Sequence, residues 1–573
     1  MNILTVVMGA AVFLAAAYAV YGRFLGERVF RLDESAATPA VAVNDGLDFV
    51  PAAKYALLGQ HFSTITAAGP INGPILAAVL FGWAPALLWV LLGSVFIGGV
   101  QDMGSLIASV RYKAKSISEI VRVNVSQKAW LIFMIFIWIT IVYLIVVFTD
   151  VTASSFVSNI VLGSGETVRG SHIASSSLMY LVFPAVIGLM TRYYRINAYI
   201  VNITILSLTV LCIWAGQVFP VVLPFPDIVL QQKVWGAVIL LYCFAASMLP
   251  VWLLMQPRGV LGGYLLYLAL FVSAVGVLFG DYSIEYPAFT TLGDSGFFDG
   301  GFLLPMFPLL FITVACGACS GFHSLVSSGT TSKQLEYETD ARAVGYGGML
   351  LEGMVAVISI ACVMIMTQDS PVLNKAPNFV YATGIGNFME FIGVPIVFGI
   401  TFGLLAFTTF VYDTLDVCAR LGRYVVEEIT GWSGTRGSIL SAGLTVCAPL
   451  FLIFQTIRDS SGQIVPIWRV FWNTFGASNQ LLAALVLASV SFWLLKSRPQ
   501  SKVWLASFIP SVIMLIMANW ALFNAIYDGW VAGKGHSVIP VVSAVLMLLS
   551  FIVSGEIFRS MLRVTDNITK PRP

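Results

Sequence analysis

Long apolar stretches dominate the pattern of the chain. They are separated by Gly, Pro or charged residues, and each is about as long as the 20 or so residues that a helix needs to cross the hydrocarbon core of a bilayer. The predicted spans are residues 3–22, 57–80, 85–109, 130–155, 175–191, 197–218, 234–256, 260–280, 303–326, 344–366, 390–417, 437–456, 471–495, 503–523 and 538–558. The pattern therefore predicts an all-α integral membrane protein of about 15 transmembrane helices.

Two of these spans contain residues that break helices. Residues 69–74 read Gly-Pro-Ile-Asn-Gly-Pro, and residues 317–331 are rich in Gly and Ser. Proline removes an intrahelical hydrogen bond, and glycine lowers the cost of opening the helix. Non-helical backbone survives at membrane depth only where it is buried in protein or lines a cavity. We predict an interruption at both places, although Gly and Pro can also serve only to kink helices or to let them pack closely.

The two interrupted spans are the second and the ninth, so they cross the membrane in opposite directions. Five spans counted from each break form two halves of opposite orientation, the pattern of a 5+5 inverted repeat with extra helices. The predicted division is residues 57–218 for the first half, 234–280 for two inserted helices, 303–495 for the second half and 503–558 for two C-terminal helices. Such repeats are typical of secondary transporters, whose substrate and ion bind at the midplane between half-helix ends.

Positive charge supports this count and gives a direction. With the N-terminus outside, 24 of the 30 Lys and Arg residues fall on the cytoplasmic side of the predicted spans. Connecting segments rich in Lys and Arg stay inside. We therefore expect a multi-pass protein with its N-terminus outside and its C-terminus inside; the family resemblance described below further implies a bacterial or archaeal cytoplasmic (inner) membrane.

Composition narrows the classes of function. The chain is 58% hydrophobic and 10% charged, whereas a soluble protein is about 25% charged. The sequence has no basic tract or zinc-finger spacing, so a nucleic-acid partner is not expected. Its seven Cys lie in or at the ends of apolar segments and predict no disulfide framework. The sequence contains no evident nucleophile–base pair, so an enzyme is not expected. The expected partners are the lipid bilayer and a small-molecule substrate.

The broken segments supply the candidate substrate site. Half-helix N-termini attract a carboxylate, and unwound carbonyl groups coordinate a cation. The candidates are Gly69, Pro70, Asn72 and Gly73 in the first segment, and Ser320, Gly321, His323, Ser324, Ser327 and Ser328 in the second. Cys316-x-x-Cys319 with His323 is only a weak metal pattern, because a fourth ligand is lacking. No cofactor is expected, and close helix packing explains the small residues better.

Ionisable residues inside spans are costly and are functional candidates by default. Asp102 and Glu352 each lie about 12 Å deep on the cytoplasmic half, taking 1.5 Å rise per residue. Either could carry a proton or act as a polar lock between helices. His61 and His323 stand one beside each break, where protonation or carboxylate binding competes with a plain buried hydrogen bond.

The end of the eleventh span carries the candidate cation site. Thr408 and Thr409 could complete a sodium site with carbonyl groups of the first break, against ordinary hydroxyl-to-backbone bonding. Asp413 lies four residues after Thr409, on the same helix face. Asp416 and Arg420 are read as an ion pair at the helix end, at the inner surface. The coupling ion is therefore left open between H⁺ and Na⁺.

Four stretches of the chain resemble the carbon starvation protein A (CstA) family. They are GQHFSTITAAGPINGPILAAVLFGWAPALLWVLLGSVFIGGVQD (59–102), ACGACSGFHSLVSSGTTSKQLEYETDARAVGYGGMLLEG (315–353), DTLDVCARLGRY (413–424) and FGASNQLLAALVL (475–487). The resemblance implies a cytoplasmic-membrane transporter linked to nutrient limitation, which takes up peptides in some members and pyruvate with protons in others. It also implies the LeuT-type architecture of the amino acid, polyamine and organocation transporters.

These observations lead to one expected function and its rivals. We expect a secondary active transporter that imports short peptides, amino acids or pyruvate by symport with H⁺ or Na⁺. A nutrient-binding sensor without net transport is the alternative, disfavoured because no cytoplasmic output domain fits between the spans. A channel is disfavoured because the breaks indicate an occluded site.

Overall fold

The computed structural model describes residues 2–46, 49–162, 165–194, 196–290, 306–458, 462–531 and 538–569. Its helices are α1 (Ile3–Phe24), α2 (Pro39–Val43), α3 (Lys54–Ile65), α4 (Gly69–Phe81), α5 (Trp83–Gly93), α6 (Gly99–Arg111), α7 (Ile117–Asn124), α8 (Gln127–Val157), α9 (Gly170–Tyr193), α10 (Ala198–Val218), α11 (Ile228–Met248), α12 (Met255–Phe279), α13 (Met306–Val314), α14 (Gly321–Gly329), α15 (Gly348–Met364), α16 (Pro377–Glu390), α17 (Ile396–Thr430), α18 (Gly434–Ile453), α19 (Ile467–Ser497), α20 (Leu505–Trp530) and α21 (Val538–Thr569). Two short antiparallel hairpins, β1 (Asn159–Val161) with β2 (Thr167–Arg169) and β3 (Ile457–Arg458) with β4 (Ile464–Val465), join helices on the surface.

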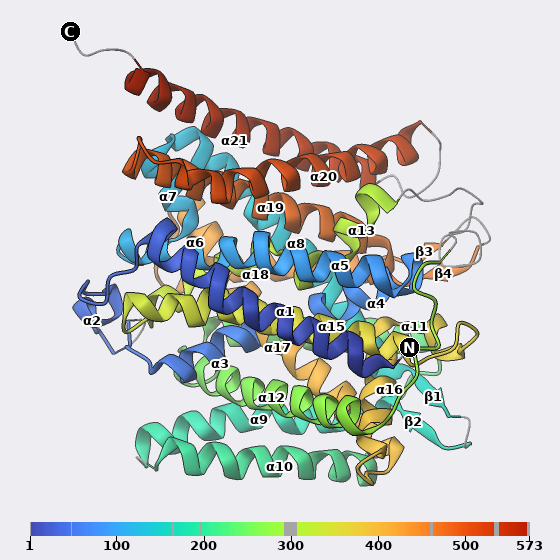
Figure 1. The fold of residues 1–573 in the computed structure, drawn as a ribbon. Helices are drawn as coiled ribbons and strands as arrows, with labels where there is room; N and C mark the ends of the chain where they lie inside the picture. The colour runs from blue at the N-terminus through green and yellow to red at the C-terminus, as the bar shows by residue number, and fades with distance from the viewer. Residues whose placement is uncertain are drawn as a thin grey trace.

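The long helices lie side by side in one bundle (Figure 1). Within the described residues, thirteen helices are long and apolar enough to cross a membrane, and the bent pair α3–α4 brings the number to fourteen. One of the fifteen predicted spans, 197–218, is not in this count. It coincides with α10, whose apolar stretch at Ile203–Val218 is shorter than a spanning helix requires. The prediction of an all-helical membrane protein is confirmed. The predicted span 303–326 begins at residues that lie outside the described part of the chain.

The first interruption lies three residues earlier than predicted. Helix α3 ends at Ile65, residues 66–68 are non-helical, and α4 begins at Gly69 with a bend of 49° between the two helices. The Gly-Pro-Ile-Asn-Gly-Pro sequence is therefore the start of a helix and not the break itself. Proline is tolerated in the first helical turn because the N–H group that it lacks has no intrahelical partner there. Pro70 occupies that position.

The second interruption is also shorter than predicted. After α13 the chain makes a 3₁₀ turn at Ala315–Gly317, residues 318–320 are non-helical, and α14 then runs from Gly321 to Gly329. Most of the predicted break at residues 317–331 is thus helical. The serines of α14 are small and are buried in the bundle, where their packing overrides their weak preference for a helix.

The inner end of α17 extends well beyond the predicted span. The helix continues to Thr430, and both Asp416 and Arg420 are buried at 2% and 5% exposure. Asp416 pairs with Arg258 of α12, and Arg420 donates hydrogen bonds to the carbonyl oxygens of Ala246 and Leu249. The predicted surface ion pair between Asp416 and Arg420 is wrong. Arg258, which the sequence placed in a cytoplasmic loop, is buried inside α12.

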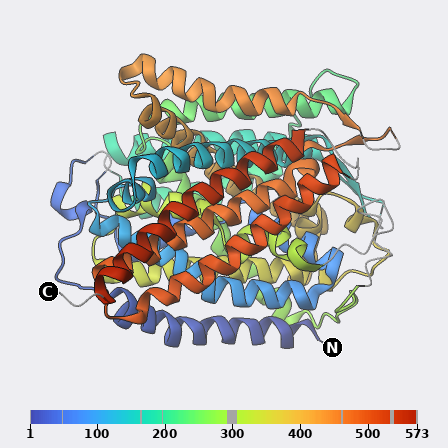
Figure 2. The same ribbon diagram turned by 90° about the horizontal axis from the view of Figure 1, so that it is seen from above.

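The centre of the bundle is formed by α8, α17 and α19 with both broken helices. Helix α8 packs on α17 and α19, and α19 packs on α13 and α14. The hairpin of α9 and α10 lies at one side of the bundle, and α20 and α21 lie at the opposite side (Figure 1). Seen from above, α18 and α11 lie along one edge and α1 along the other (Figure 2). The peripheral helices therefore enclose a core in which the two interruptions meet.

A set of contacts recurs between the two parts of the core. Helix α4 packs on α15, and α14 packs on α6; α12 packs on α17, and α19 packs on α8. Helix α11 contacts α8 as α18 contacts α17, and α11 and α18 also contact each other. Short helices precede α8 and α17 in the same way, since α7 packs on α8 and α16 packs on α17.

Three glycines allow the broken helices to touch. A Cβ atom on Gly69 would overlap the side chain of Cys316, and one on Gly73 would overlap the carbonyl oxygens of Thr313 and Val314. On the facing segment of backbone, a Cβ on Gly317 would lie 3.2 Å from Cγ of Pro74. Helix α4 and the α13–α14 interruption are therefore in backbone contact.

We predict that Gly73→Val disrupts this contact. The added side chain meets backbone atoms, which cannot rotate away, so we expect destabilisation of about 1–3 kcal/mol or more. A lower melting temperature of the detergent-solubilised protein would measure the effect. Gly9→Val is the matched control, because a Cβ at Gly9 on the exposed face of α1 has no atom within 4 Å. Equal melting temperatures for the two variants would contradict the close contact.

Candidate functional site

A buried histidine joins two carboxylates beside the second interruption. His323 lies in the first turn of α14, with Nδ1 at 3.0 Å from Oδ2 of Asp102 on α6 and Nε2 at 3.1 Å from Oε2 of Glu352 on α15. The first contact has the geometry of a hydrogen bond, and the second is an ion-pair contact without that alignment. All three side chains are fully buried. The predicted residues Asp102, His323 and Glu352, which come from three different helices, thus form one cluster, which we call the carboxylate–histidine triad.

The charge of the triad constrains its protonation. With no proton bound, two carboxylates and a neutral imidazole carry two negative charges in a site without exposed surface. Burying uncompensated charge is very costly, so such groups pair or change protonation. Electrical neutrality requires two protons shared among the three groups. The triad is therefore a place where charge, burial and protonation must be balanced among three neighbouring groups.

The two helices that carry the carboxylates share an unusual feature. A π-helical segment, Ser94–Gly98, lies between α5 and α6, and another, Arg342–Gly347, directly precedes α15. π-Helical turns inside α-helices are frequent at functional sites, because the extra residue turns nearby side chains. Asp102 and Glu352 each follow such a segment within ten residues. Each carboxylate thus lies within two helical turns of an irregular segment of its own helix.

An amide-rich layer surrounds the interruption at residues 318–320. Gln101 Nε2 donates to the Ser320 carbonyl oxygen at 2.5 Å and to Ser324 Oγ at 2.6 Å. Asn479 of α19 accepts from the backbone N–H of Phe322 at 3.0 Å and donates to Ser320 Oγ at 3.0 Å. The Asn479 amide thus caps the N-terminus of α14 by satisfying one of the orphan donors of the helix start.

Other predicted residues lie nearby without side-chain partners. Both amide atoms of Asn72, in the first turns of α4, are buried and have no hydrogen-bond partner among the described residues, and the same holds for Ser327 Oγ. A buried polar group without a partner is costly unless a ligand or water satisfies it. Ser328 differs, because its hydroxyl donates to the Ser324 carbonyl and accepts from the N–H of Ile117. Asn72 and Ser327 are thus the more suitable ligand-binding groups.

His61 connects the first broken helix with the segment after α14. Its Nδ1 lies 2.9 Å from Thr331 Oγ1, and its ring packs against the backbone of α15 at Gly348. Nε2 is buried and has no hydrogen-bond partner among the described residues. His61 also lies within electrostatic range of His323. The two predicted histidines therefore belong to one buried region.

The candidate cation residues of α17 separate into two groups. Thr408 Oγ1 is 3.0 Å from Ser177 Oγ of α9, so it contacts the peripheral hairpin and not the first interruption. Thr409 Oγ1 is buried without a partner in the described part of the chain. Asp413 accepts from Ser63 of α3 at 2.5 Å. Thr414, which sequence reasoning missed, is the threonine of α17 that donates to a carbonyl oxygen of α3, at Thr64.

The pattern Cys316-x-x-Cys319 is built into packing and hydrogen bonds. Cys316 Sγ contacts Ser320 Oγ and the Asn479 amide, and Cys319 Sγ lies 3.1 Å from Gln101 Oε1. No group of three or more His, Cys, Asp or Glu residues with metal-binding geometry occurs among the described residues. Each thiol instead helps to satisfy the amides of the second interruption.

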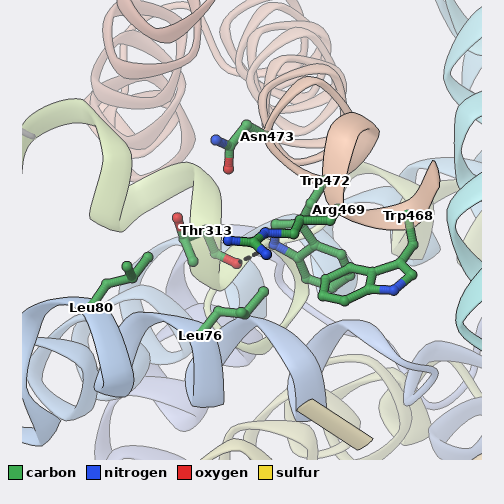
Figure 3. Close-up of a pocket in the computed structure, with 7 residues that line it drawn as sticks. All are labelled: Leu76, Leu80, Thr313, Trp468, Arg469, Trp472 and Asn473. Carbon is green, nitrogen blue, oxygen red and sulfur yellow. Dashed lines mark hydrogen bonds between the residues drawn. The ribbon is translucent and has the colours of Figure 1, made fainter. Parts of the chain in front are cut away.

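The two sides of the site differ in access. At the end of the bundle that the charge pattern places outside, α19 closes over α4 and α13. Trp472 Nε1 donates to the Thr313 carbonyl oxygen at 3.1 Å, and a narrow cleft remains there (Figure 3). The cleft is lined by Leu76, Leu80, Thr313, Trp468, Arg469, Trp472 and Asn473.

A larger cavity lies at the opposite end. It has a volume of about 250 Å³ and is lined by residues of α7, α8, α14 and α17, among them Leu325, Ser328, Lys333, Leu421 and Glu428. Its walls are mainly apolar, and its polar lining residues include Ser328 near the C-terminal end of α14, Lys333 just beyond that helix and Glu428 of α17. Of these two places, the one beside Trp472 is thus the more tightly packed.

Several important residues were missed from the sequence. Gln101, Asn479 and Arg258 are buried polar groups within spans. Amides in the middle of an apolar helix were a visible signal for the first two. For Arg258 the signal was the pair Asp413 and Asp416, because two carboxylates in a span require a positive partner.

The fold and the site together define a class of protein: a polytopic helical membrane transport protein with a buried cluster of ionisable residues beside its broken helices. The sequence model of the family "Carbon starvation protein CstA" matches residues 2–378 and 368–521. The chain belongs to this family, and the predicted family membership is confirmed.

Several relatives share most of the chain. The peptide transporter CstA of Campylobacter jejuni is 30% identical over 571 residues, covering 89% of this chain and 78% of that protein. The peptide transporter CstA of Bacillus subtilis is 29% identical and covers 96% of both chains. The pyruvate/proton symporter BtsT of Escherichia coli is 29% identical, with 90% of this chain and 80% of that protein covered.

Distant likenesses also occur among solved structures. A crystal structure of a mutant of the manganese transporter of Eremococcus coleocola aligns with 91% of this chain and 99% of that chain, at 10% identity and a TM-score of 0.48. The likeness is too weak to assign a substrate or a site.

We predict that Asn479→Ala separates the role of the amide layer from general stability. The change leaves the Phe322 N–H and Ser320 hydroxyl without their partner, which costs about 1–3 kcal/mol, and it loosens the start of α14. Asn519→Ala is the matched control, since Asn519 of the peripheral α20 is also buried and makes two hydrogen bonds. Both variants should melt earlier, whereas only Asn479→Ala should lose substrate uptake. Equal uptake in the two would contradict a role for the layer in the site.

Proposed function

We propose that the protein is a secondary active transporter that imports a small carboxylate-bearing nutrient, a short peptide or pyruvate, by symport with protons. The carboxylate–histidine triad carries the proposal. Its three ionisable groups are fully buried: His323 lies on α14 of the second broken helix, and the two carboxylates lie on α6 and α15. Relatives described as peptide transporters and as a pyruvate/proton symporter support both the transport and the proton.

The recurring contacts support an inverted repeat. The contacts pair α3–α4 with α13–α14, α6 with α15, α8 with α17, α11 with α18 and α12 with α19. In this division the fourth and fifth helices of the first half are α11 and α12. The inserted pair is then the peripheral hairpin α9–α10, whereas the sequence prediction placed the insertion at residues 234–280. An inverted repeat provides two related packings of the same core, which alternating access requires.

Binding of the substrate carboxylate is assigned to the starts of α4 and α14. Each helix N-terminus presents backbone N–H groups and a positive dipole end, which together attract an anion. The amide of Asn72 and the hydroxyl of Ser327 are buried without hydrogen-bond partners in the described part of the chain, so both are available to a ligand. The negative substrate and the positive imidazolium of His323 then stabilise each other.

Coupling follows from the charge of the triad. When the site faces outside, protons on Asp102, Glu352 and His323 give the triad one positive charge, which the anionic substrate neutralises, so that the loaded site can be occluded. When the site faces inside, substrate release leaves that positive charge buried without a counter-charge, and the protons leave. His61 with Thr331 lies on the inner side of the triad and is a suitable exit for them.

The 250 Å³ cavity is the proposed exit for the substrate. It adjoins Leu325 and Ser328 of α14, the second and fifth residues after His323. Apolar walls with Lys333 at the rim suit a small organic anion that leaves for the cytoplasm, because the anion is attracted but not tightly bound.

Uptake into proteoliposomes tests the function. Purified protein is reconstituted, and labelled pyruvate, dipeptides and amino acids are supplied with an imposed inward proton gradient, with an inward sodium gradient, or with none. We expect uphill accumulation of one substrate class with the proton gradient. Equilibration without accumulation would indicate a channel, and binding without uptake would indicate a sensor.

We predict that substitutions in the triad uncouple transport from the proton gradient. Glu352→Gln and Asp102→Asn keep the size of each side chain but hold its charge at zero, as if a proton were permanently bound. Exchange of labelled for unlabelled substrate at equal pH should continue at more than about a tenth of the wild-type rate. Accumulation driven by the gradient should fall at least about tenfold, a smaller factor than the rate contribution typical of a positioned acid or base.

Asp150→Asn is the matched control for these variants. Asp150 is also buried, in α8, but it accepts from the Trp468 N–H at 2.8 Å and from Gln232, and so caps α19. This variant should lower stability and keep the ratio of accumulation to exchange. Loss of coupling in Asp150→Asn to the same degree as in Glu352→Gln would contradict the assignment of the proton site.

A further inference from the structure

A second buried charge cluster lies apart from the triad, between the inner half of the first broken helix and its neighbours. Arg258 of α12 is 1% exposed and forms ion pairs with Asp416 and, through Nε at 3.6 Å, with Asp413, both on α17. Tyr242 of α11 donates to Asp416 Oδ2 at 2.9 Å, and its ring lies under the guanidinium at 5.0 Å. This cluster is not used by the proton step proposed above.

The cluster is tied directly to α3. Ser63 of α3 donates to Asp413 Oδ2 at 2.5 Å, and the next residue, Thr64, accepts at its carbonyl oxygen from Thr414. Gly262, one turn after Arg258 on α12, makes the approach possible, since a Cβ there would overlap both Asp413 Oδ2 and Ser63 Oγ. Helices α3, α12 and α17 therefore meet at Asp413.

The groups around Asp413 resemble the lining of a cation site. Carboxylate and hydroxyl oxygens are ligands of hard cations, and here Asp413 Oδ1 and Thr409 Oγ1 are buried without hydrogen-bond partners in the described part of the chain. The buried phenol of Tyr180 also lies within electrostatic range of Asp413. The positive charge at this place, however, already belongs to the protein, because the guanidinium of an arginine stays protonated under all ordinary conditions.

We propose that Arg258 is a resident cation that replaces a coupling sodium ion, so that α3 closes against α17 without sodium. The inference rests on the proposed transport function and names the residue that decides its ion specificity. Two carboxylates buried with no counter-charge would be costly, so Asp413 and Asp416 would gain contact with water by separation of α3 from α17, or would recruit a metal cation. With Arg258 in place, the Ser63–Asp413 contact holds the inner half-helix shut, and protons alone supply the driving force.

The position of α3 can be measured without any substrate. Spin labels are placed at Tyr55→Cys, at the exposed start of α3, and at Arg436→Cys, at the exposed start of α18, with the exposed Cys447 changed to Ser. Double electron–electron resonance in nanodiscs then gives the distribution of distances between them. The measurement is made in sodium chloride and in potassium chloride at equal concentration.

We expect the wild-type distribution to be the same in both salts, and Ser63→Ala to raise the ratio of open to closed α3 about tenfold or more, the effect of losing a buried hydrogen bond to a charged group. Ser177→Ala is the matched control. It also removes a buried hydroxyl partner of α17, that of Thr408, but it touches α9 and not α3, so the distribution should not change.

Arg258→Gln provides the decisive comparison. This variant keeps much of the bulk of the side chain and removes the charge, so α3 should open in potassium and close again, at least in part, in sodium. Closure of the wild-type protein that depends on sodium would overturn the proposal, as would Ser63→Ala behaving like Ser177→Ala. Both results are independent of uptake, so failure of this inference and failure of the transport function are told apart.

Discussion

The structure depends on one constraint, which is that a buried polar group at membrane depth must find its partner inside the protein. Hydrocarbon offers no hydrogen bonds, so each interruption of a helix survives only if other elements satisfy it. The break at residues 66–68 is held by Thr414, and the break at 318–320 by Gln101 and Asn479. The interruptions, and with them the site, thus exist because α6, α17 and α19 pack around them.

The same constraint explains the two charge clusters. Each contains two buried carboxylates and one basic side chain, but the basic groups differ in kind. An arginine keeps its proton, so Arg258 supplies a fixed positive charge beside Asp413 and Asp416. Their cluster is therefore suited to a structural role at α3. Histidine is the side chain suited to gaining and losing a proton under physiological conditions, and for this reason the proton step proposed above is placed at the triad around His323. The difference between the two clusters thus follows from the chemistry of one basic residue in each, Arg258 or His323.

Close backbone contact places the two interruptions side by side. Gly69, Gly73 and Gly317 let α4 and the α13–α14 segment approach until a methyl group would not fit between them. Both helix starts therefore belong to one site. Trp472 packs closely at one end of the bundle, and the 250 Å³ cavity lies at the other end.

The sequence by itself determined the membrane class, the apolar spans, both broken helices and most of the buried ionisable residues, because hydrophobicity, proline and charge act over a few neighbouring residues. It misplaced the breaks by several residues, since whether Pro70 begins or interrupts a helix depends on what satisfies the adjacent backbone. Only the tertiary structure decided that His323 lies between Asp102 and Glu352 and that Arg258 forms an ion pair with Asp413. Asp102 and His323 are 221 positions apart in the chain, and no local pattern encodes which helices come into contact.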